Sequence, residues 1–463
     1  MFRIFHHYIP SSIVWLILIE FVVLFLSVYA GVEIRFLENL DSRSSLEPIL
    51  PKALSFSIAM WLSMTAMGLH TRNVVDDFSG LMIRIGLSFC LGFLGNALVF
   101  YVYPELFLGR GVLALAMIVS FMCILITRTV FQKLDKHKIF KSRILVLGVG
   151  NRAKILSDMD GAYKRQGYEI VGYVKSNDKI VAIPDNKIIE IQTTLVDLVL
   201  DNDVDEIVLA MDDRRQGFPV SGLLECKMSG IQIRDIVHFL ERVTGHIELD
   251  VLHPSVMIFS SGFTKAVSPG NGKRLFDIIA SILILILASP VIILTYVAIW
   301  MSSLGKYPVF YKQTRIGLCN APFEVLKFRS MKMDAEKDGA QFAKKNDSRV
   351  TLIGAFIRKT RIDELPQLFN VLRGEMSFVG PRPERPEFVL GFDHDIPHYS
   401  LRHTVKPGIT GWAQICYPYG ETLEDTRNKL QYDLYYIKNY SLFLDMTILL
   451  QTIQVVLFGQ GSR

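Results

Sequence analysis

The feature that most constrains the fold is a set of four long, nearly charge-free segments in the first 130 residues. They cover residues 12–32, 53–69, 81–102 and 111–127. Each approaches the roughly 20 residues that an α-helix needs to cross a lipid bilayer. Half of the residues in the chain are hydrophobic, and they gather in blocks of this kind. The sequence therefore predicts a membrane protein whose residues 1–130 form a block of four transmembrane helices.

The charges that follow the fourth segment indicate its orientation. Between Arg128 and Arg143 the chain carries six Lys or Arg residues against one acid, Asp135. Such an excess of positive charge marks the cytoplasmic side of a membrane. Four crossings then place the N-terminus in the cytoplasm as well. Segment 12–32 has no cleavage site suited to a signal peptide, so it is expected to stay as a membrane helix. Glu20 and Arg84 lie inside or next to these segments. Such residues can mark a polar pathway, but a helix-contact or interface position is expected.

The overall charge and the cysteines exclude other classes of protein. A net charge of +5 is too small to indicate nucleic-acid binding. The five cysteines have no metal-ligand spacing and suggest no disulfide framework. They are expected to be packing residues.

Residues 131–265 have the pattern of an α/β domain. Ile144–Leu147 is expected to be a buried strand, followed by the glycine turn Gly148-Val-Gly150 and the start of a helix. Further strands are expected at 170–174 and 206–210. This order is that of a dinucleotide-binding fold. The second strand, however, lacks the following acidic residue that would hold a ribose. The sequence favours a Rossmann-like domain without a bound dinucleotide.

A fifth uncharged run extends from Ile278 to Met301 and is long enough to span a bilayer. Basic residues lie on both sides of it, which conflicts with a simple crossing. Ser289-Pro290 lies in its middle, where proline removes a helical hydrogen bond and serine can satisfy the freed carbonyl. We therefore expect residues 268–305 to form a helix–break–helix that enters the membrane and returns. Lys273 and Arg274 are expected to anchor it at the headgroups. A fifth full span with a proline kink is the alternative.

Two adjacent carboxylates, Asp363 and Glu364, precede Pro366 in the last part of the chain. Leu365, Leu368, Phe369 and Leu372 follow with the spacing of one buried helix face, and Gly374 is expected to end that helix. The carboxylates thus lie at or just before a helix N-terminus, where anions such as phosphate are favoured. An ordinary aspartate cap would give the same local pattern.

Arginines on both sides of the carboxylates suggest a catalytic role. The four are Arg358, Arg361, Arg382 and Arg385. Gly380-Pro-Arg-Pro383 is expected to be a stiff turn that presents a guanidinium. Acids next to fixed arginines suit phosphoryl chemistry with a metal ion.

The part from Lys273 onward resembles the bacterial polyprenyl-phosphate hexose-1-phosphate transferases, also called monotopic phosphoglycosyl transferases. The motifs that carry the resemblance are Lys273–Asp277, Ser289-Pro290, Leu326–Met331, Arg358–Gln367, Ser377–Pro383 and Lys406–Gln414. The first 270 residues resemble the large members of the family in layout only.

The resemblance implies transfer of a sugar-1-phosphate from a UDP-sugar, with glucose or galactose expected, to undecaprenyl phosphate with release of UMP. It implies that Asp363 is the nucleophile, that Glu364 is its partner, and that both carboxylates hold Mg²⁺. Residues 306–463 are then the catalytic domain, an α-rich α/β fold. The residues expected to bind the diphosphate are Lys327, Arg329, Arg358, Arg361 and Arg382.

The resemblance also implies a place in the cell. The enzyme would lie in the bacterial inner membrane, with its active site facing the cytoplasm and in contact with lipids. It would start exopolysaccharide, capsule or O-antigen repeat units, and it could assemble as a homo-oligomer such as a dimer.

The apolar stretch Leu442–Phe458 has two interpretations. It can be an amphipathic helix at the membrane surface or a helix of the protein core. Two other functions also stay open. One is an oxidoreductase or sugar-nucleotide-modifying enzyme centred on Gly148 and Gly150, and the other is an inactive membrane regulator of polysaccharide assembly.

Overall fold

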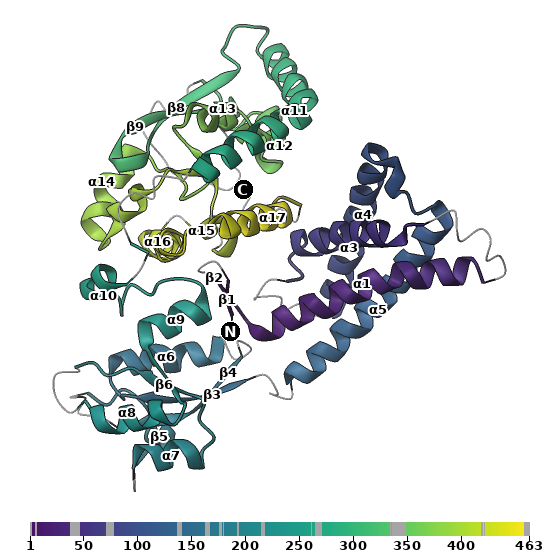
Figure 1. Ribbon diagram of the computed structural model, residues 1–463. Coiled ribbons are helices and arrows are strands. Elements are labelled where there is room, and N and C mark those ends of the chain that lie inside the picture. Colours follow the sequence, from purple (N-terminus) through teal and green to yellow (C-terminus); the bar gives the residue numbers. More distant parts are fainter. Residues whose placement is uncertain are drawn as a thin grey trace. The chain divides into compact units, whose positions relative to one another are not determined.

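The computed structural model describes the chain except for residues 1, 5–6, 38–46, 71–77, 137–140, 163–166, 176–177, 179, 192–193, 214–217, 261, 264–270, 334, 336–348, 418–419, 421 and 458–463. Apart from a short N-terminal piece, it divides into two compact units, one up to Val251 and the other from Leu252 (Figure 1). Two short strands come first, β1 (Phe2–Ile4) and β2 (His7–Ile9).

The four apolar segments near the N-terminus are helical, as predicted. The helices are α1 (Ser11–Arg35), α3 (Ile49–Ala66), α4 (Phe78–Val102) and α5 (Arg110–Lys136), with the 3₁₀ turn η2 (Pro104–Leu106) between the last two. Leu24, Phe56 and Met60 are fully buried where these helices pack together. Each of the four is long and apolar enough to cross a membrane, which fits a membrane protein.

A charged cluster joins three parts of this helical block. The Glu20 carboxylate on α1 accepts hydrogen bonds from Arg128 Nε at 2.5 Å and from Arg128 Nη2 at 2.9 Å. The ring of His70 lies 2.8 Å from the same carboxylate. Glu20 therefore makes a helix contact, as predicted. Arg128 is only 6% exposed, because it neutralises Glu20, so it should not be counted among the free positive charges at the end of α5.

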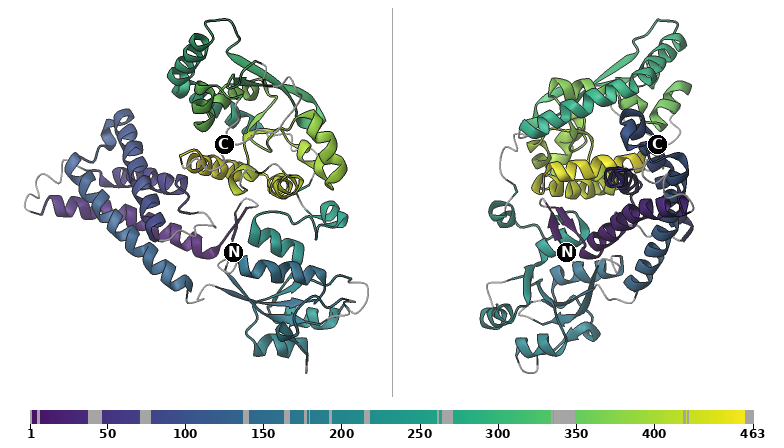
Figure 2. Two further views of the ribbon diagram at one scale, coloured as in Figure 1. Left: turned by 180° about the vertical axis from the view of Figure 1, so that it is seen from behind. Right: turned by 45° about the vertical axis from the view of Figure 1, so that its right-hand side comes forward.

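The middle of the chain forms a parallel five-stranded sheet in the order β5-β4-β3-β6-β7. Its strands are β3 (Ser142–Leu147), β4 (Tyr168–Val174), β5 (Ile188–Ile189), β6 (Glu206–Leu209) and β7 (Gln232–Asp235). The helical segments are α6 (Asn151–Ala162), η3 (Asp185–Lys187), α7 (Leu195–Asp201), α8 (Val220–Met228) and α9 (Ile236–Thr244). In the views of Figures 1 and 2, α6 and α9 cover one face and α7 and α8 the other. The three predicted strands are all present.

The second unit is rich in helices and short strands. Before the carboxylates come α10 (Pro254–Phe259), α11 (Asn271–Ser302), β8 (Phe310–Ile316), η4 (Leu318–Asn320), β9 (Pro322–Phe328) and α12 (Leu352–Lys359). Then follow η5 (Ile362–Glu364), α13 (Gln367–Arg373), β10 (Ser377–Val379), α14 (Pro386–Asp395), η6 (Tyr399–Thr404), β11 (Gly408–Thr410), α15 (Trp412–Cys416), α16 (Leu423–Lys438) and α17 (Leu442–Leu457). Strands β8 and β9 form an antiparallel hairpin, and β10 pairs with β11 in parallel.

The boundary between the units precedes the predicted domain boundary at residue 265. Gly262 lies so close to the backbone of Lys438 on α16 that a side chain there would collide with it. The segment containing α10 therefore belongs to the second unit.

Helix α11 is one continuous element of 32 residues. The predicted break does not interrupt the helix, which continues through Pro290, and the predicted return within the membrane stays a prediction. The local reason for the prediction is nevertheless present. Pro290 cannot donate to the carbonyl of Ile286, and Ser289 Oγ donates to that oxygen at 2.8 Å. The serine replaces the missing bond and lets the helix continue.

Helix α17 packs one side into the second unit. Leu444, Asp445 and Ile448 are completely buried, whereas Met446 is 43% exposed. The described part of this stretch is thus a helix with one face in the core.

Candidate active site

The carboxylates Asp363 and Glu364 lie in the short turn η5, directly before α13. Arg361, with a left-handed φ of 58°, turns the chain from α12 into η5, and Gly374 ends α13 with a φ of 87°. Both carboxylates are 8% exposed. The sequence therefore predicted correctly that these acids precede a helix and that glycine ends it.

The prediction of which residues of α13 are buried is wrong in part. The buried residues of the helix are Gln367, Leu368, Asn370 and Val371, whereas Phe369 is 42% exposed. Asn370 is buried because its side chain bonds the backbone of β9. Its amide donates to Glu324 O at 2.7 Å, and its oxygen accepts from Leu326 N at 3.0 Å. These bonds fix the carboxylate turn against the strand that carries Lys327.

Three cations surround Glu364. Arg382 Nη2 donates to Glu364 Oε1 at 2.6 Å, and Lys327 Nζ donates to the same oxygen at 3.3 Å. Arg361 Nη1 lies 3.7 Å from Oε2. Burial alone would raise the pKa of Glu364, but the charges of Arg382, Lys327 and Arg361 outweigh it and hold the pKa well below its usual range. Glu364 therefore stays ionised.

Asp363 differs from Glu364 in its contacts and in the direction of its pKa shift. No described residue donates a hydrogen bond to its carboxylate. Burial and the negative charge of Glu364 raise the pKa of Asp363, although Lys327, Arg382 and Arg361 counteract part of the rise. A buried acid without a partner is costly to keep. This arrangement leaves Asp363 available for a ligand.

Backbone contacts hold Arg382 in place. The β10–β11 pair continues into the turn, where Gly380 N donates to Thr410 O at 2.9 Å and Gly408 N donates to Pro381 O at 2.9 Å. Arg402 Nη2 donates to the carbonyl of Arg382 at 2.9 Å. Since Gly380 and Gly408 approach each other too closely for a side chain, the turn can present its guanidinium only with glycine at these positions.

The predicted diphosphate-binding residues separate into two groups. The structure brings Lys327, Arg361 and Arg382 to the carboxylates. Arg329 instead lies over the ring of Tyr307, with its guanidinium carbon 5.6 Å from the ring centroid. Arg358, near the end of α12, has no recorded ion pair or side-chain hydrogen bond with a described residue.

Lys273 and Arg274 differ from the predicted headgroup anchors. Lys273 is 7% exposed, and its ammonium binds Asp445 of α17 at 2.7 Å. Arg274 donates to the carbonyls of Val371 and Leu372 at 2.6 and 2.7 Å, at the end of α13. Both side chains thus bind α11 to its own unit, because carbonyls and a carboxylate inside the protein satisfy their charges.

Sequence reasoning missed two buried polar clusters that support the site. In one, Tyr436 donates to Asp445 Oδ1 at 2.8 Å, opposite Lys273. In the other, Arg402 lies 2.9 Å from Asp433 and donates to Tyr399 at 2.6 Å. A signal was available, since an acid within a stretch of aromatic and aliphatic residues usually has a buried partner.

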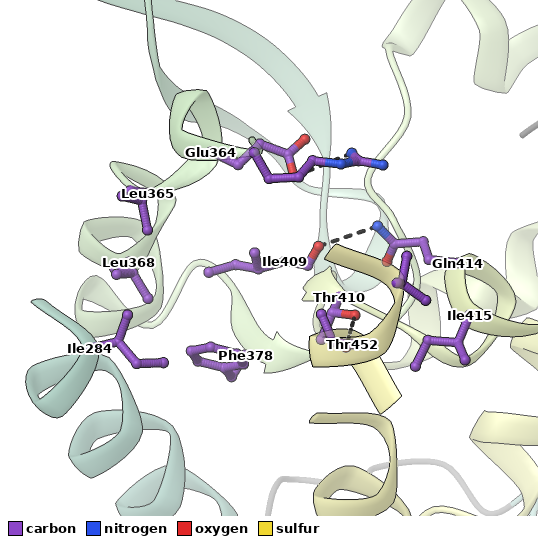
Figure 3. Close-up of a pocket in the computed structure, with 12 residues that line it drawn as sticks. Ile284, Glu364, Leu365, Leu368, Phe378, Ile409, Thr410, Gln414, Ile415 and Thr452 are labelled. Atoms are coloured by element: carbon purple, nitrogen blue, oxygen red, sulfur yellow. Dashed lines mark hydrogen bonds and ion pairs between the residues drawn. The ribbon is translucent and has the colours of Figure 1, made fainter. Parts of the chain in front are cut away.

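A mostly apolar pocket of about 170 Å³ adjoins Glu364. Its walls come from α11, η5, α13, both strands of the β10–β11 pair, α15 and α17. The residues that line it are Ile284, Arg361, Glu364, Leu365, Leu368, Phe378, Ile409, Thr410, Gln414, Ile415, Thr452 and Val455. Figure 3 shows Glu364 at one end and Ile284 with Phe378 at the other.

The glycine turn of the middle domain is already filled by side chains of its own domain. The Asp212 carboxylate accepts from the backbone N–H groups of Asn151 and Arg152 at 2.9 and 3.0 Å, at the start of α6. Asp178 accepts from Val149 N at 2.7 Å. A side chain at Gly150 would collide with Asp212. The position where a dinucleotide fold binds pyrophosphate is thus occupied by carboxylates.

Comparison with known proteins identifies the family. Residues 269–459 match the family model for bacterial sugar transferases. An uncharacterized sugar transferase, EpsL, of Bacillus subtilis is 42% identical over 191 residues, which cover 41% of this chain and 90% of that protein. The chain belongs to the bacterial sugar transferase family. Asp363 and Glu364 lie within the matched part.

Two further relatives carry descriptive names. The UDP-N-acetylgalactosamine-undecaprenyl-phosphate N-acetylgalactosaminephosphotransferase of Aeromonas hydrophila is 44% identical over 243 residues, or 52% of this chain and 56% of that protein. The UDP-glucose:undecaprenyl-phosphate glucose-1-phosphate transferase of Klebsiella pneumoniae is 42% identical over 260 residues, 54% of each. The match thus spans just over half the length of these two relatives.

Proposed function

We propose that this sugar transferase moves a sugar-1-phosphate from a UDP-sugar to undecaprenyl phosphate and releases UMP. The observation that carries the proposal is Asp363, a buried carboxylate that accepts no hydrogen bond from a described residue, next to Glu364 and three cations. Donor and acceptor both bring phosphate groups, which Lys327, Arg361 and Arg382 can neutralise. The named relatives use substrates of these classes.

The reaction proceeds in two displacements. An Asp363 carboxylate oxygen attacks the phosphorus that bears the sugar, and the bond from that phosphorus to the bridging oxygen breaks. UMP leaves with that oxygen and the electron pair. A phosphate oxygen of the lipid then attacks the same phosphorus, and the Asp363 carboxylate leaves. The carboxylate thus divides one displacement into two.

Glu364 holds the cations in place during both displacements. It stays ionised because Arg382, Lys327 and Arg361 lower its pKa. In return it fixes Arg382 and Lys327 beside Asp363, at the position where the diphosphate must lie. Preorganised cations of this kind stabilise charge that develops in the transition state.

Two carboxylates fit a Mg²⁺ ion, which usually takes one or two from the protein and completes its shell with phosphate oxygens and water. The described residues contain no cluster of three or more acids, histidines or cysteines. Glu364 Oε2 accepts no recorded hydrogen bond from a described residue, since Arg361 is 3.7 Å away. Glu364 and Asp363 would hold the ion together with the diphosphate. Bound Mg²⁺ would neutralise charge on the donor phosphates.

We place the enzyme in the bacterial inner membrane with its site towards the cytoplasm, where it would start surface-polysaccharide repeat units. Helix α11 would enter and leave on the same side of the membrane. Single cysteines at Phe259 and Lys306, in a background without the native cysteines, test this topology with a membrane-impermeant thiol reagent. Protection of both in intact cells is expected. Labelling of the Lys306→Cys variant alone would mean that α11 crosses.

The chemistry is tested with purified enzyme, Mg²⁺ and a panel of UDP-sugars in the absence of lipid. About one equivalent of UMP per enzyme is expected from the correct sugar nucleotide. Intact-protein mass spectrometry should detect the matching sugar-phosphate adduct. Addition of undecaprenyl phosphate should discharge it. UMP release that requires the lipid, together with no adduct, would contradict the two-step reaction.

A further inference from the structure

The pocket next to Glu364 has the properties of a site for an isoprenoid chain. Most of its lining residues are aliphatic or aromatic. Thr410 and Thr452 bond each other through their hydroxyls at 2.8 Å, and Gln414 Nε2 donates to Ile409 O at 3.2 Å (Figure 3). The two hydroxyls and the Gln414 amide nitrogen are thus satisfied within the protein, whereas Gln414 Oε1 is not.

One end of the pocket is charged and the other is apolar. Glu364 and Arg361 lie at the charged end, next to the proposed phosphoryl-transfer site. Ile284, at the far end in Figure 3, belongs to α11. A ligand with a phosphate head and a hydrocarbon tail matches this gradient.

The apolar end continues onto a surface suited to lipid. Ile286 and Leu287 on the same helix are 64% and 78% exposed, and Leu283 is 54% exposed. Helix α11 is apolar enough to enter a membrane. A tail that leaves the pocket beside Ile284 would therefore pass directly into the bilayer along α11.

The size of the pocket limits what it can hold. A cavity of about 150 Å³ in another protein binds benzene, which has six carbons. A cavity of about 170 Å³ therefore suits a single five-carbon isoprene unit. The rest of a long prenyl chain must lie outside it.

From these observations we propose that the pocket bounded by α11, α13, the β10–β11 pair and α17 binds the isoprene unit next to the phosphate of the lipid acceptor. This inference rests on the proposed function. The rival occupant is the donor sugar. Gln414 Oε1, which is buried without a partner among the described residues, would suit a sugar hydroxyl.

Filling the pocket distinguishes the two occupants. In Thr452→Phe the new ring would take the space of the isoprene unit. The KM for undecaprenyl phosphate should rise at least about tenfold, because buried apolar contact is lost. The donor half-reaction, measured as exchange of labelled UMP into UDP-sugar without lipid, should stay within about twofold of the wild-type rate. Ile453→Phe, on the adjacent exposed position of α17, is the matched control and should change neither.

Ile415→Ala provides a second test that adds no bulk, and should also raise the lipid KM. Farnesyl phosphate should compete with undecaprenyl phosphate in the wild type and less well in Thr452→Phe. A rise in the KM for UDP-sugar or a loss of exchange in Thr452→Phe would assign the pocket to the donor. Unchanged lipid KM in both variants would also overturn the inference. Absence of exchange and transfer in the wild type would instead disprove the proposed function.

Discussion

Two regions of this chain place carboxylates next to a turn that precedes a helix. The two regions differ in whether the protein itself supplies hydrogen-bond donors to those carboxylates. In the middle domain, Asp212 and Asp178 accept backbone hydrogen bonds around the glycine turn. In the transferase domain, Glu364 is bound by cations and Asp363 has no donor among the described residues. The middle domain has the better-known motif, but its anion-binding groups are already satisfied. The difference teaches that an unsatisfied group is a better guide to chemistry than a motif.

The largest effect should come from Asp363→Asn. The amide cannot act as a nucleophile, so transfer and UMP exchange should both fall by at least about 10³-fold. The fold should be retained, because the change removes a negative charge that lies beside Glu364 and accepts no hydrogen bond from a described residue. Activity and thermal unfolding of the purified protein are the measurements.

Asp212→Asn is the matched substitution in the middle domain, and transfer by this variant should be unchanged. Comparable losses in the two variants would mean that the middle domain takes part in the chemistry. That result would remove the contrast between the two regions.

The next largest effect is expected from Arg382→Gln. The substitution removes the 2.6 Å contact with Glu364 and one of the three cations around the proposed diphosphate position. Loss of one preorganised donor typically costs about 10²–10³ in kcat. Arg358→Gln is the control, since Arg358 has no recorded bond to a described residue, and it should cost much less. Equal losses would support the broader set of arginines that the sequence predicted.

Much of the site could be predicted because its information is local. The length of the apolar segments determined the four N-terminal helices, and the Asp-Glu-x-Pro order placed the acids before a helix. Gly374 ends that helix because it can adopt the left-handed φ of 87°. The turn at Gly380–Pro383 likewise followed from neighbouring residues.

The remaining features depend on contacts between distant residues. Lys273 binds Asp445, which lies 172 residues away in the sequence. Because the sequence does not show this partner, the position of Lys273 beside the apolar run suggested a membrane anchor. Arg329 was predicted to bind the diphosphate because it is charged. Its position over the Tyr307 ring could not be inferred from that charge. Phe369 looked like a core residue, whereas Asn370 took the buried position because β9 offers it backbone partners. The sequence could not reveal which face of α13 meets that strand.

A truncated chain tests whether the middle domain is needed. Residues 268–463 in detergent or nanodiscs should retain transfer within about tenfold, or about 1.4 kcal/mol in activation free energy. The reason is that only 41% of this chain matches 90% of the length of EpsL, and the family model matches residues 269–459. The full-length enzyme under the same conditions is the control. A folded truncation that binds UDP-sugar but never transfers would contradict the domain assignment.

A smaller effect is expected on the pH dependence. Burial and Glu364 raise the pKa of Asp363, and the nucleophile is the ionised form. Activity should therefore be lost as the pH falls through a value above the ordinary aspartate pKa of about 3.9. Lys327→Met removes a charge that opposes this rise, so its acid limb should move to higher pH. The rate of UMP exchange against pH is the measurement, and an acid limb that does not move would argue against ionised Asp363 as the nucleophile.

The smallest effect concerns the stability of the middle domain. Asp212 accepts from the N–H groups of Asn151 and Arg152, which begin α6, and its charge suits the positive end of that helix. Asp212→Asn keeps one acceptor oxygen but loses the charge, so it should destabilise the start of α6 by about 1 kcal/mol. Hydrogen exchange of the peptide containing these two amides should become faster, whereas Asp201→Asn, an exposed substitution at the end of α7, should leave it unchanged. If NAD or UDP-sugar slows exchange of this peptide in the wild-type enzyme, a ligand can displace Asp212. The middle domain would then hold a second phosphate site, whose backbone donors are occupied by its own carboxylates until a ligand displaces them.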